Sequence, residues 1–484
     1  MWATFRISSF VPRGVDIAST YISTAMLGTK FDGACAYMAD ADLVFALLFV
    51  FRYLRFVVHF ITGILLYKPS PIKEGPRYTS NDVAVIIPTV APNTQAFLHC
   101  CETVLTNQPR MLIIATVGIK LENDILRMID AHKFKSRFPK TEYIVIKTDQ
   151  ANKRKQVALA GSIIDPTIAP ITVCVDDHVY WGDSFLKSLL AAFEDPKVGL
   201  VGTNKKVIRD TAGGLWKSYT NFLACTYLTR HNFQIRSEPY IDGGIFVVSG
   251  RTSAIRTEIL RDDHFRAGYQ DERFFFGVLG PLNPDDDNYI TRWALRHGWR
   301  VRIQYTPECR IVTPLGDPRK FYGQTRTTWR SNLASLRQWH TWRHFPWSVY
   351  AIYISSLFSF AIAWDPLLVW SLTRTTLYLE SDRRLQALLL TLMVMWIFGS
   401  KMVKIAPHFW DYPSDLVWLP GYLAFAYWHS LVKLYCGLTF WDYAWNGRNL
   451  AMTEMASVKN LEMEKLQQIS RPKMLRGTTG LYGP

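Results

Sequence analysis

The stretch ITVCVDDHVYW, residues 171–181, decides the fold class and the chemistry expected of this chain. An apolar, β-branched run ends abruptly in two adjacent carboxylates, Asp176 and Asp177. A buried strand that delivers paired acids to its carboxyl end is how an α/β sheet holds a divalent metal against a phosphate-bearing ligand. The sequence therefore predicts Asp176 and Asp177 as metal ligands, with His178 either a further ligand or a neighbour that shapes the turn. The alternative for any single acid pair is a solvated strand end.

The block around this stretch, residues 81–346, alternates apolar β-rich runs with helix-like segments. Strands that are separated by helices indicate an α/β fold with a doubly wound, mostly parallel sheet. The expected strands are residues 83–89, 111–117, 142–148 and 171–177, and the expected helices between them are residues 97–107, 121–132 and 152–164.

Apolar segments flank this block on both sides. Residues 43–67 form 25 mostly apolar positions, enough to span a bilayer of ~30 Å at ~1.5 Å per residue. Arg52, Arg55 and His59 share one face of that helix. They are interpreted either as residues that snorkel to the membrane interface or pair inside a helix bundle, or as a polar stripe that lines a pathway.

The C-terminal region predicts about three transmembrane or re-entrant helices, with candidate segments at residues 347–372, 385–400 and 416–438. The expected organisation is an N-terminal segment (1–42), a transmembrane helix (43–67), an α/β domain (68–320), an interfacial amphipathic helix (321–346), the C-terminal helices (347–440) and a tail (441–484).

Composition narrows the class of partner. The net charge of +15 is spread along the chain, which suits an anionic partner such as a nucleotide-sugar or the anionic face of a membrane. A nucleic acid is disfavoured, because dispersed basic residues and apolar spans do not suit one. The seven cysteines form no CxxC or Cys/His cluster, so we expect no zinc site and a reducing compartment. No cleavable signal peptide is expected at the N-terminus.

Two further charged clusters suit chemistry on a phosphate ester. Lys153 and Arg154 open a predicted helix and could hold a diphosphate, although an isolated basic turn is more often solvated. Residues 285–287 are three consecutive aspartates at a predicted helix N-terminus, where carboxylates cap free N–H groups. Capping accounts for one or two of them, so the third hints at a general base.

Two other segments are candidate substrate contacts. Pro88 and Thr89 end the first predicted strand, where a nucleotide base can sit, although an ordinary turn is equally expected there. Arg326, Trp329 and Arg330 lie in a basic, aromatic stretch just before the first C-terminal apolar segment. The arginines can meet phosphate oxygens and Trp329 can stack on a sugar ring; simple membrane anchoring is the compatible alternative.

Together these motifs resemble the processive, membrane-bound glycosyltransferases of family 2, and most of all their fungal polysaccharide-synthase-like branch. The resemblance covers about residues 83–448. Its specificity lies in the order of the motifs, since each one is weak. Two motifs depart from the usual pattern, because His178 replaces an aspartate and Trp329 precedes Arg330. In chain order, the matching residues are Pro88, Thr89, Lys153, Arg154, Asp176, Asp177, His178, Ser249, Gly250, Asp285, Asp286, Asp287, Arg326, Trp329 and Arg330.

The resemblance implies a GT-A-type fold with flanking transmembrane helices, a UDP-sugar donor, Mg²⁺ or Mn²⁺ as cofactor, and a growing glycan as acceptor. It implies Asp287, or else Asp286, as the catalytic base, and Ser249 and Gly250 on the acceptor side. The expected enzyme is inverting and processive, lies in the plasma membrane among its lipids with a cytosolic catalytic domain, and builds an extracellular or cell-wall polysaccharide. A non-processive, ceramide-type lipid glycosyltransferase is the first alternative, and a non-catalytic nucleotide-binding transporter or scaffold is the second. The sugar and the oligomeric state stay open.

Overall fold

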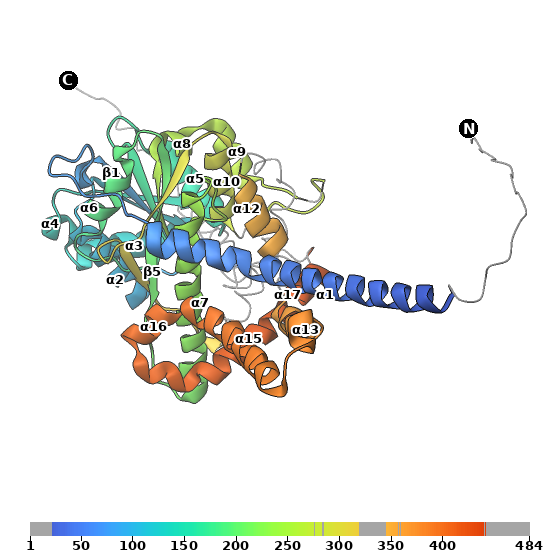
Figure 1. Cartoon of the computed structure of the whole chain (residues 1–484). Coiled ribbons are helices and arrows are strands. Elements are labelled where there is room, and N and C mark those ends of the chain that lie inside the picture. Colours follow the sequence, from blue (N-terminus) through green and yellow to red (C-terminus); the bar gives the residue numbers. More distant parts are fainter. Residues whose placement is uncertain are drawn as a thin grey trace, which may run out of the picture. The chain divides into compact units, whose positions relative to one another are not determined.

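The computed structural model describes residues 22–274, 276–282, 285–318, 345–356, 358, 360–439 and 441. These residues fall into two compact units. One contains the described residues within 1–53 and 363–398, and the other contains those within 54–362 and 399–484. The second unit holds the sheet and every site residue discussed below (Figure 1).

The second unit is built on an eight-stranded, mostly parallel sheet. Its order is β3-β2-β1-β4-β6-β5-β7, and β8 pairs with β5. Strand β6 runs antiparallel to both neighbours, whereas the other pairs are parallel. The four predicted strands and the α/β class are confirmed. The strands are β1 (Val83–Pro88), β2 (Met111–Val117), β3 (Glu142–Thr148), β4 (Ile171–Val175), β5 (Val198–Val207), β6 (Thr252–Arg256), β7 (Arg300–Gln304) and β8 (Arg310–Thr313).

Helices cover both faces of the sheet, as the alternation along β1 requires. Successive side chains of a strand point to opposite faces, so Val83, Val85 and Ile87 enter one apolar core and Ala84 and Ile86 enter the other. The first core is covered by α2 (Gln95–Thr106), α3 (Gly118–Ala131) and α6 (Phe185–Leu190), with the short α4 (Phe134–Arg137) and η3 (Ala191–Glu194). The second is covered by α5 (Lys153–Ile163), α8 (Thr257–Arg261), α9 (Asp263–Gln270) and α10 (Asp286–Arg296). Strands buried on both faces read as unbroken apolar runs.

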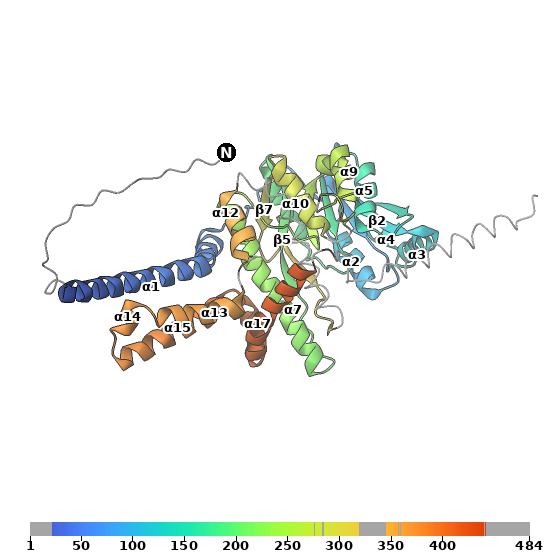
Figure 2. The same cartoon turned by 90° about the vertical axis from the view of Figure 1, so that its right-hand side faces the viewer.

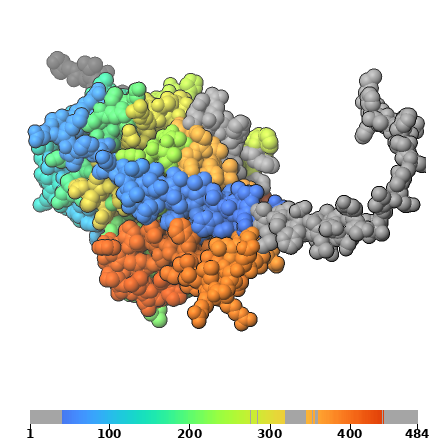
Figure 3. Space-filling view, in the orientation of Figure 1, coloured from blue at the N-terminus to red at the C-terminus, as the bar shows by residue number. Residues whose placement is uncertain are grey.

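A long helix, α7 (Leu215–Ser237), packs against a C-terminal segment of the same unit. In Figures 1 and 2 the green α7 runs from the sheet to the red segment formed by α16 (Ala406–Asp411), η7 (Pro413–Trp418) and α17 (Leu419–Leu438). Arg209, just after β5, pairs with Asp415 through two contacts of 2.7 and 2.8 Å. In Figure 3 a green part of α7 emerges beneath the red surface. Sequence reasoning did not predict this helix or the pairing of Arg209 with Asp415.

Two helices among the described residues are long and apolar enough to cross a membrane. They are Asp40–Leu66, formed by the end of α1 (Ile22–Phe60) with η1 (Ile61–Leu66), and α15 (Arg383–Val403). The predicted spans at residues 43–67 and 385–400 fall on them. The remaining C-terminal helices are α12 (Pro346–Val349), η6 (Tyr350–Ser356), α13 (Ala361–Leu372) and α14 (Thr376–Leu379), and the other short turns are η2 (Ser80–Asp82) and η4 (Glu238–Tyr240).

The basic residues of the first apolar helix have polar partners, as the pairing interpretation expects. Each contact lies within one unit. The pairs are Arg52 with Asp365 (3.2 Å), Arg55 with Glu238 (3.5 Å), and the indole N–H of Trp347 donating to His59 Nε2 (3.3 Å).

Candidate active site

The predicted site residues gather at the carboxyl ends of β1 and β4. The chain passes from β1 outward to β2 and β3, then returns to the other side of β1 with β4, so the strand order reverses between β1 and β4. In an open α/β sheet such a reversal leaves a crevice where ligands bind. Asp176 and Asp177 directly follow β4, and Thr89 directly follows Pro88 at the end of β1.

Asp177 is a buried and firmly held carboxylate. Its exposed fraction is 5%. Thr89 Oγ1 donates to Asp177 Oδ2 at 2.7 Å, and His178 Nδ1 lies 2.9 Å from Asp177 Oδ1. Thr89 is itself held by its N–H, which donates to the carbonyl of Ala115 at 2.9 Å. Thr89 therefore joins the ends of β1 and β4, so its role at the site includes fixing the acid pair.

Lys153 lies between carboxylates from distant parts of the chain. Its Nζ is 2.8 Å from Asp176 Oδ1 and 3.1 Å from Asp286 Oδ2. A cation in the first turn of α5 opposes the helix dipole, and the two acids offset that cost. Burial lowers the pKa of Lys153, but the two carboxylates outweigh it and raise the pKa above its usual value. Burial raises the pKa of Asp176, and Lys153 reverses this, so that pKa is lowered.

Arg154 points into the protein. Its side chain is 0% exposed, and its Nη2 lies 3.0 Å from Glu272 Oε2. Its Nη1 donates to the carbonyl of Tyr269 at 3.0 Å, and its guanidinium lies over the Tyr269 ring. Arg292 pairs with the same glutamate. This enclosure does not favour the direct diphosphate contact expected of Arg154, and we propose instead that it positions the segment that leads into α10.

Asp287 lies in the first turn of α10. Its Oδ2 accepts the N–H of Gly250 and its Oδ1 accepts the N–H of Asn288, each at 2.9 Å. Burial raises the pKa of Asp287, the charge of Asp286 raises it further, and the N–H of Gly250 opposes both, leaving the pKa raised. A carboxylate whose pKa is raised towards the working pH suits general-base catalysis.

The segment Ser249-Gly250 packs directly against this carboxylate. Ser249 is 6% exposed. A Cβ added to Gly250 would lie 3.2 Å from Asp287 Cβ and 3.4 Å from its Oδ2, so the close approach depends on glycine. The acceptor-side segment predicted from the sequence therefore also sets the position of the base candidate.

The other two aspartates of the cluster are placed differently. The predicted helix start is confirmed, because α10 begins at Asp286. Asp285 precedes it with φ of 59°. Asp286 Oδ2 contacts Lys153 and accepts the Tyr269 hydroxyl at 3.3 Å. Asp286 is ion-paired with Lys153, whereas the partners of Asp287 described above are backbone N–H groups and burial raises its pKa, so Asp287 is the better candidate for the base.

The last predicted motif, Arg326, Trp329 and Arg330, lies outside the described residues, as does most of the predicted interfacial helix at 321–346. Both therefore stay predictions.

A divalent metal suits the donors after β4. No group of three or more His, Cys, Asp and Glu arranged for a metal occurs among the described residues. However, Mg²⁺ and Mn²⁺ take oxygen ligands and usually complete their shell with waters and substrate phosphates, so one or two carboxylates suffice. A carboxylate has about four acceptor positions on its two oxygens, so Asp176 and Asp177 are suitable ligand types. These two residues, with the imidazole of His178 beside them, could hold such a metal.

A buried pair near the site was not predicted. Lys205 of β5 is 2% exposed, and its Nζ lies 2.6 Å from Nδ1 of His231 on α7. Burial lowers the pKa of Lys205 well below its usual value, and the charge of Arg251 adds to this while Asp287 opposes it. The only signal in the sequence is a lysine at an inward position of the apolar run VGLVGTNKKV.

Comparison with known proteins identifies the family. Residues 81–333 match the family described as "Glycosyltransferase like family 2". A type 2 glycosyltransferase of Pyricularia oryzae is 36% identical over 85% of this chain and 83% of its own, and one of Zymoseptoria tritici is 35% identical over 83% and 82%. Hyaluronan synthase 3 of Xenopus laevis is 24% identical over 45% of this chain and 38% of its own. A solved mannosyltransferase from Pyrobaculum calidifontis covers 81% of this chain and 99% of its own at 14% identity, with a TM-score of 0.43.

The family match spans more than half of the 484 residues, and it contains the whole sheet. The fungal relatives extend the similarity along most of both chains. The mostly parallel sheet agrees with the GT-A-type fold expected from the resemblance. On these grounds the chain belongs to glycosyltransferase family 2 and is a glycosyltransferase.

Proposed function

We propose that this enzyme transfers sugar from a UDP-sugar to a growing glycan, with inversion at the anomeric carbon and processive elongation. The observation that carries the proposal is the convergence of Asp176, Lys153 and Asp287 at one sheet edge. Asp176 and Lys153 are in direct contact, and Asp287 adjoins Asp286, the second carboxylate held by Lys153. A cation beside paired acids suits a diphosphate, and a separate carboxylate suits a proton acceptor.

In the proposed step, Asp287 accepts the proton of the acceptor hydroxyl. The hydroxyl oxygen bonds to the anomeric carbon as the bond to the diphosphate oxygen breaks on the opposite face, which inverts the configuration. The electron pair of the broken bond leaves with UDP. Lys153 stabilises the charge that develops on the leaving diphosphate. The carbonyl of Gly250 lies 3.5 Å from Lys153 Nζ, and this contact helps to hold the ammonium at the site.

Mg²⁺ or Mn²⁺, bound by Asp176 and Asp177, would neutralise diphosphate charge. Thr89 keeps Asp177 fixed for this role, and Pro88 ends the strand against which the uracil base would lie. Arg326 and Arg330 would add cations to the diphosphate, and Trp329 would stack on the acceptor sugar. These roles extend the prediction made from the sequence.

The polymer product is favoured by the similarity to hyaluronan synthases over 228 residues. The two apolar helices suit an enzyme that works beside a membrane and passes its product through it. The proposed location is the plasma membrane, with a cytosolic catalytic domain supplied with nucleotide-sugars and a polysaccharide exported to the surface or wall. A lipid glycosyltransferase of the ceramide type is the rival, since it shares the motifs and differs in product. Family membership favours an enzyme over the non-catalytic transporter or scaffold.

The test is to incubate membranes containing the full chain with individual radiolabelled UDP-sugars and Mn²⁺, then to size the product. A labelled polymer of many sugars from one UDP-sugar supports the proposal. A single-sugar product that extracts with lipid supports the rival and contradicts processive synthesis.

Asp287→Asn tests the base. We expect turnover to fall by a factor of about 10² to 10⁴, the usual contribution of a general base. Asp130→Asn, at an exposed position on α3, is the matched control and should leave turnover unchanged. Turnover of Asp287→Asn near the wild-type level, with an unchanged melting temperature, would show that another group is the base.

A further inference from the structure

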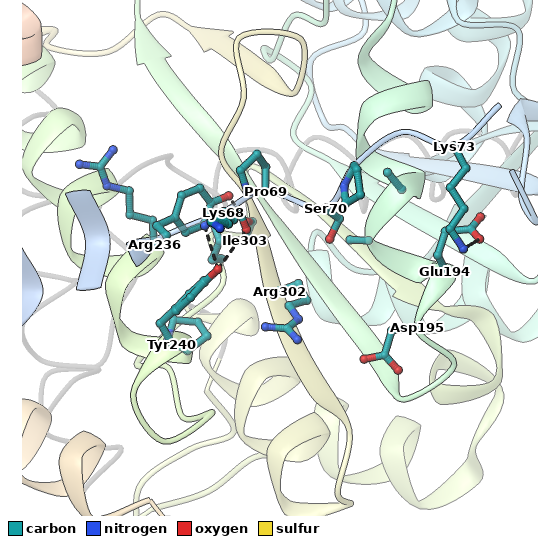
Figure 4. Close-up of a pocket in the computed structure, with 15 residues that line it drawn as sticks. Lys68, Pro69, Ser70, Lys73, Glu194, Asp195, Arg236, Tyr240, Arg302 and Ile303 are labelled. Atoms are coloured by element: carbon teal, nitrogen blue, oxygen red, sulfur yellow. Dashed lines mark hydrogen bonds and ion pairs between the residues drawn. The ribbon is translucent and has the colours of Figure 1, made fainter. Parts of the chain in front are cut away.

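A second pocket lies away from the acid cluster, where the chain leaves its first apolar helix (Figure 4). Its volume is 270 Å³, near the lower end for ligand pockets. In Figure 4, Arg236 and Lys68 lie on the same side as Tyr240, across from Glu194, and Arg302 projects into the space between. None of these residues has a role in the proposed transfer reaction.

The acidic residues of this pocket are already neutralised. Glu194 contacts Lys73 Nζ at 3.0 Å and accepts the N–H of Arg77 at 2.7 Å. Asp195 contacts Arg300 at 3.0 Å and accepts the N–H of Lys197 at 2.9 Å. Each carboxylate is therefore paired with a cation other than Lys68, Arg236 and Arg302, although the charge of Arg302 also helps to lower the pKa of Asp195.

Three cations remain: Lys68, Arg236 and Arg302. Within the described part of the chain, none forms an ion pair with a carboxylate. Arg236 lies over the ring of Tyr305, with its Cζ 4.8 Å from the ring centroid, and its buried Nε has no hydrogen-bond partner there. In Figure 4 the guanidinium of Arg236 is directed away from Arg302, so Arg236 adds positive charge at the rim and is not the main contact for an anion.

The pocket is tied rigidly to the end of the apolar helix Asp40–Leu66. The next residue, Tyr67, donates its hydroxyl to the carbonyl of Ile303 at 2.7 Å and accepts the N–H of Tyr305 at 2.8 Å. Ser70 exchanges two hydrogen bonds with the side chain of Gln304, at 3.0 and 2.9 Å. These contacts hold Lys68 between two anchored residues. If the apolar helix spans a membrane, the pocket opens at the level of the lipid headgroups.

We propose that this pocket binds the phosphate of an anionic phospholipid headgroup, with Arg302 and Lys68 as its main cations and Arg236 beside them. Juxtamembrane cations attract anionic lipids, and arginine forms paired hydrogen bonds to phosphate oxygens. The inference rests on the membrane location within the proposed function. It does not depend on the sugar, the acceptor or the catalytic base.

The test is native mass spectrometry of the detergent-solubilised full chain, titrated with phosphatidylglycerol or phosphatidylcholine. Wild type should retain phosphatidylglycerol in preference to phosphatidylcholine. Each cation removed by Arg302→Gln or Lys68→Gln should weaken retention by about fivefold, whereas Arg302→Lys should keep most of it. Lys140→Gln removes an exposed lysine far from the pocket in sequence, in the turn before β3, and should change nothing.

Equal retention of the two lipids by wild type would overturn the proposal. So would equal retention by wild type and the Arg302→Gln/Lys68→Gln double variant. A competition experiment with glycerol phosphate tests whether a soluble phosphate ester binds equally well. If it displaces phosphatidylglycerol at equal concentration, the pocket is a general anion site and the lipid assignment is wrong. Lipid retention is measured without turnover, so a chain that binds the lipid but makes no polymer counts against the proposed function alone.

Discussion

Lys153→Met should destabilise the site more than any other single removal of a surface-accessible charge in it. The substitution keeps a side chain of similar length and removes the ammonium from between Asp176 and Asp286. Its contacts with these carboxylates are 2.8 and 3.1 Å long. The variant leaves two acids facing each other without the cation, with Asp287 adjacent.

The magnitude follows from these distances and from exposure. At an effective dielectric constant of about 20, unit charges about 3 Å apart attract by about 5 kcal/mol, before the cost of desolvation. Removing one partner of a fully buried pair costs about 3–5 kcal/mol, and exposed pairs contribute about 0–1 kcal/mol. The side chain of Lys153 is 29% exposed and that of Asp176 is 24% exposed. We therefore expect a loss of about 2 kcal/mol, which lowers the melting temperature of a domain of this size by about 4–8 °C.

The assay is thermal unfolding of the purified full chain in detergent, with Lys155→Met as the matched control. Lys155 lies in the same helical turn, and its Nζ contacts the side chain of Gln150. Its loss should shift the melting temperature by less than about 2 °C. The double variant Lys153→Met/Asp286→Asn should recover part of the loss, because it removes one of the uncompensated charges.

Added Mn²⁺ gives a second readout on the same samples. If Asp176 and Asp177 take a divalent cation, Mn²⁺ replaces the missing positive charge and should raise the melting temperature of Lys153→Met more than that of wild type. An unchanged melting temperature for Lys153→Met, together with wild-type donor affinity, would refute the reasoning that Lys153 balances these acids.

Three further predictions concern the base and its support. Asp286→Asn removes the charge that helps to raise the pKa of Asp287; since the base acts when ionised, the acidic limb of the pH–rate profile should move to lower pH, and a shift to higher pH would contradict this. Gly250→Ala should displace Asp287 by steric contact with the added methyl group. We expect kcat to fall by about tenfold or more with little change in KM for the donor, as steady-state kinetics would show. Arg154→Met leaves Glu272 buried with Arg292 as its remaining partner, so it should lower stability by about 2–4 kcal/mol in denaturant unfolding, and reduced donor affinity at unchanged stability would restore the direct substrate role for Arg154.

Three of the four predicted strands follow a simple pattern, and the fourth, β3, is only partly buried. Strands β1, β2 and β4 are buried on both faces and read as continuous apolar runs. The second half of the sheet does not follow that pattern. Strand β5 carries Asn204 and Lys205 in its buried interior, and β6 is a short strand, TSAIR, that runs antiparallel. The desolvation cost of a buried polar residue in a strand is offset by hydrogen-bond partners on other elements. For Lys205 the partner is His231 on α7, and a single sequence does not reveal such a partner.

The acid pair and the aspartate cluster could also be proposed as site residues, because paired acids after a buried strand suit a divalent metal and three aspartates at a helix start exceed what capping requires. Their direct contact through Lys153 could not, because residues 153, 176 and 286 belong to three separate segments: the start of α5, the turn after β4 and the start of α10. The pocket lined by Tyr67 could not be predicted from a sequence motif, because its cations at positions 68, 236 and 302 come from three separate segments.

The adjacent pair Lys153 and Arg154 shows why a motif does not assign roles by itself. On a helix, positions three, four and seven residues apart share a face; from Arg154 these are Val157, Ala158 and Gly161, all buried. That spacing predicts an inward guanidinium, and Glu272 supplies its counter-charge. Lys153 is one residue before Arg154, about 100° away around the helix axis, and as the first residue of α5 its side chain reaches the carboxylates at the sheet edge. Two neighbouring cations of one motif thus divide into one that faces the crevice and one that supports it, and substitutions at the two positions should separate donor binding from folding.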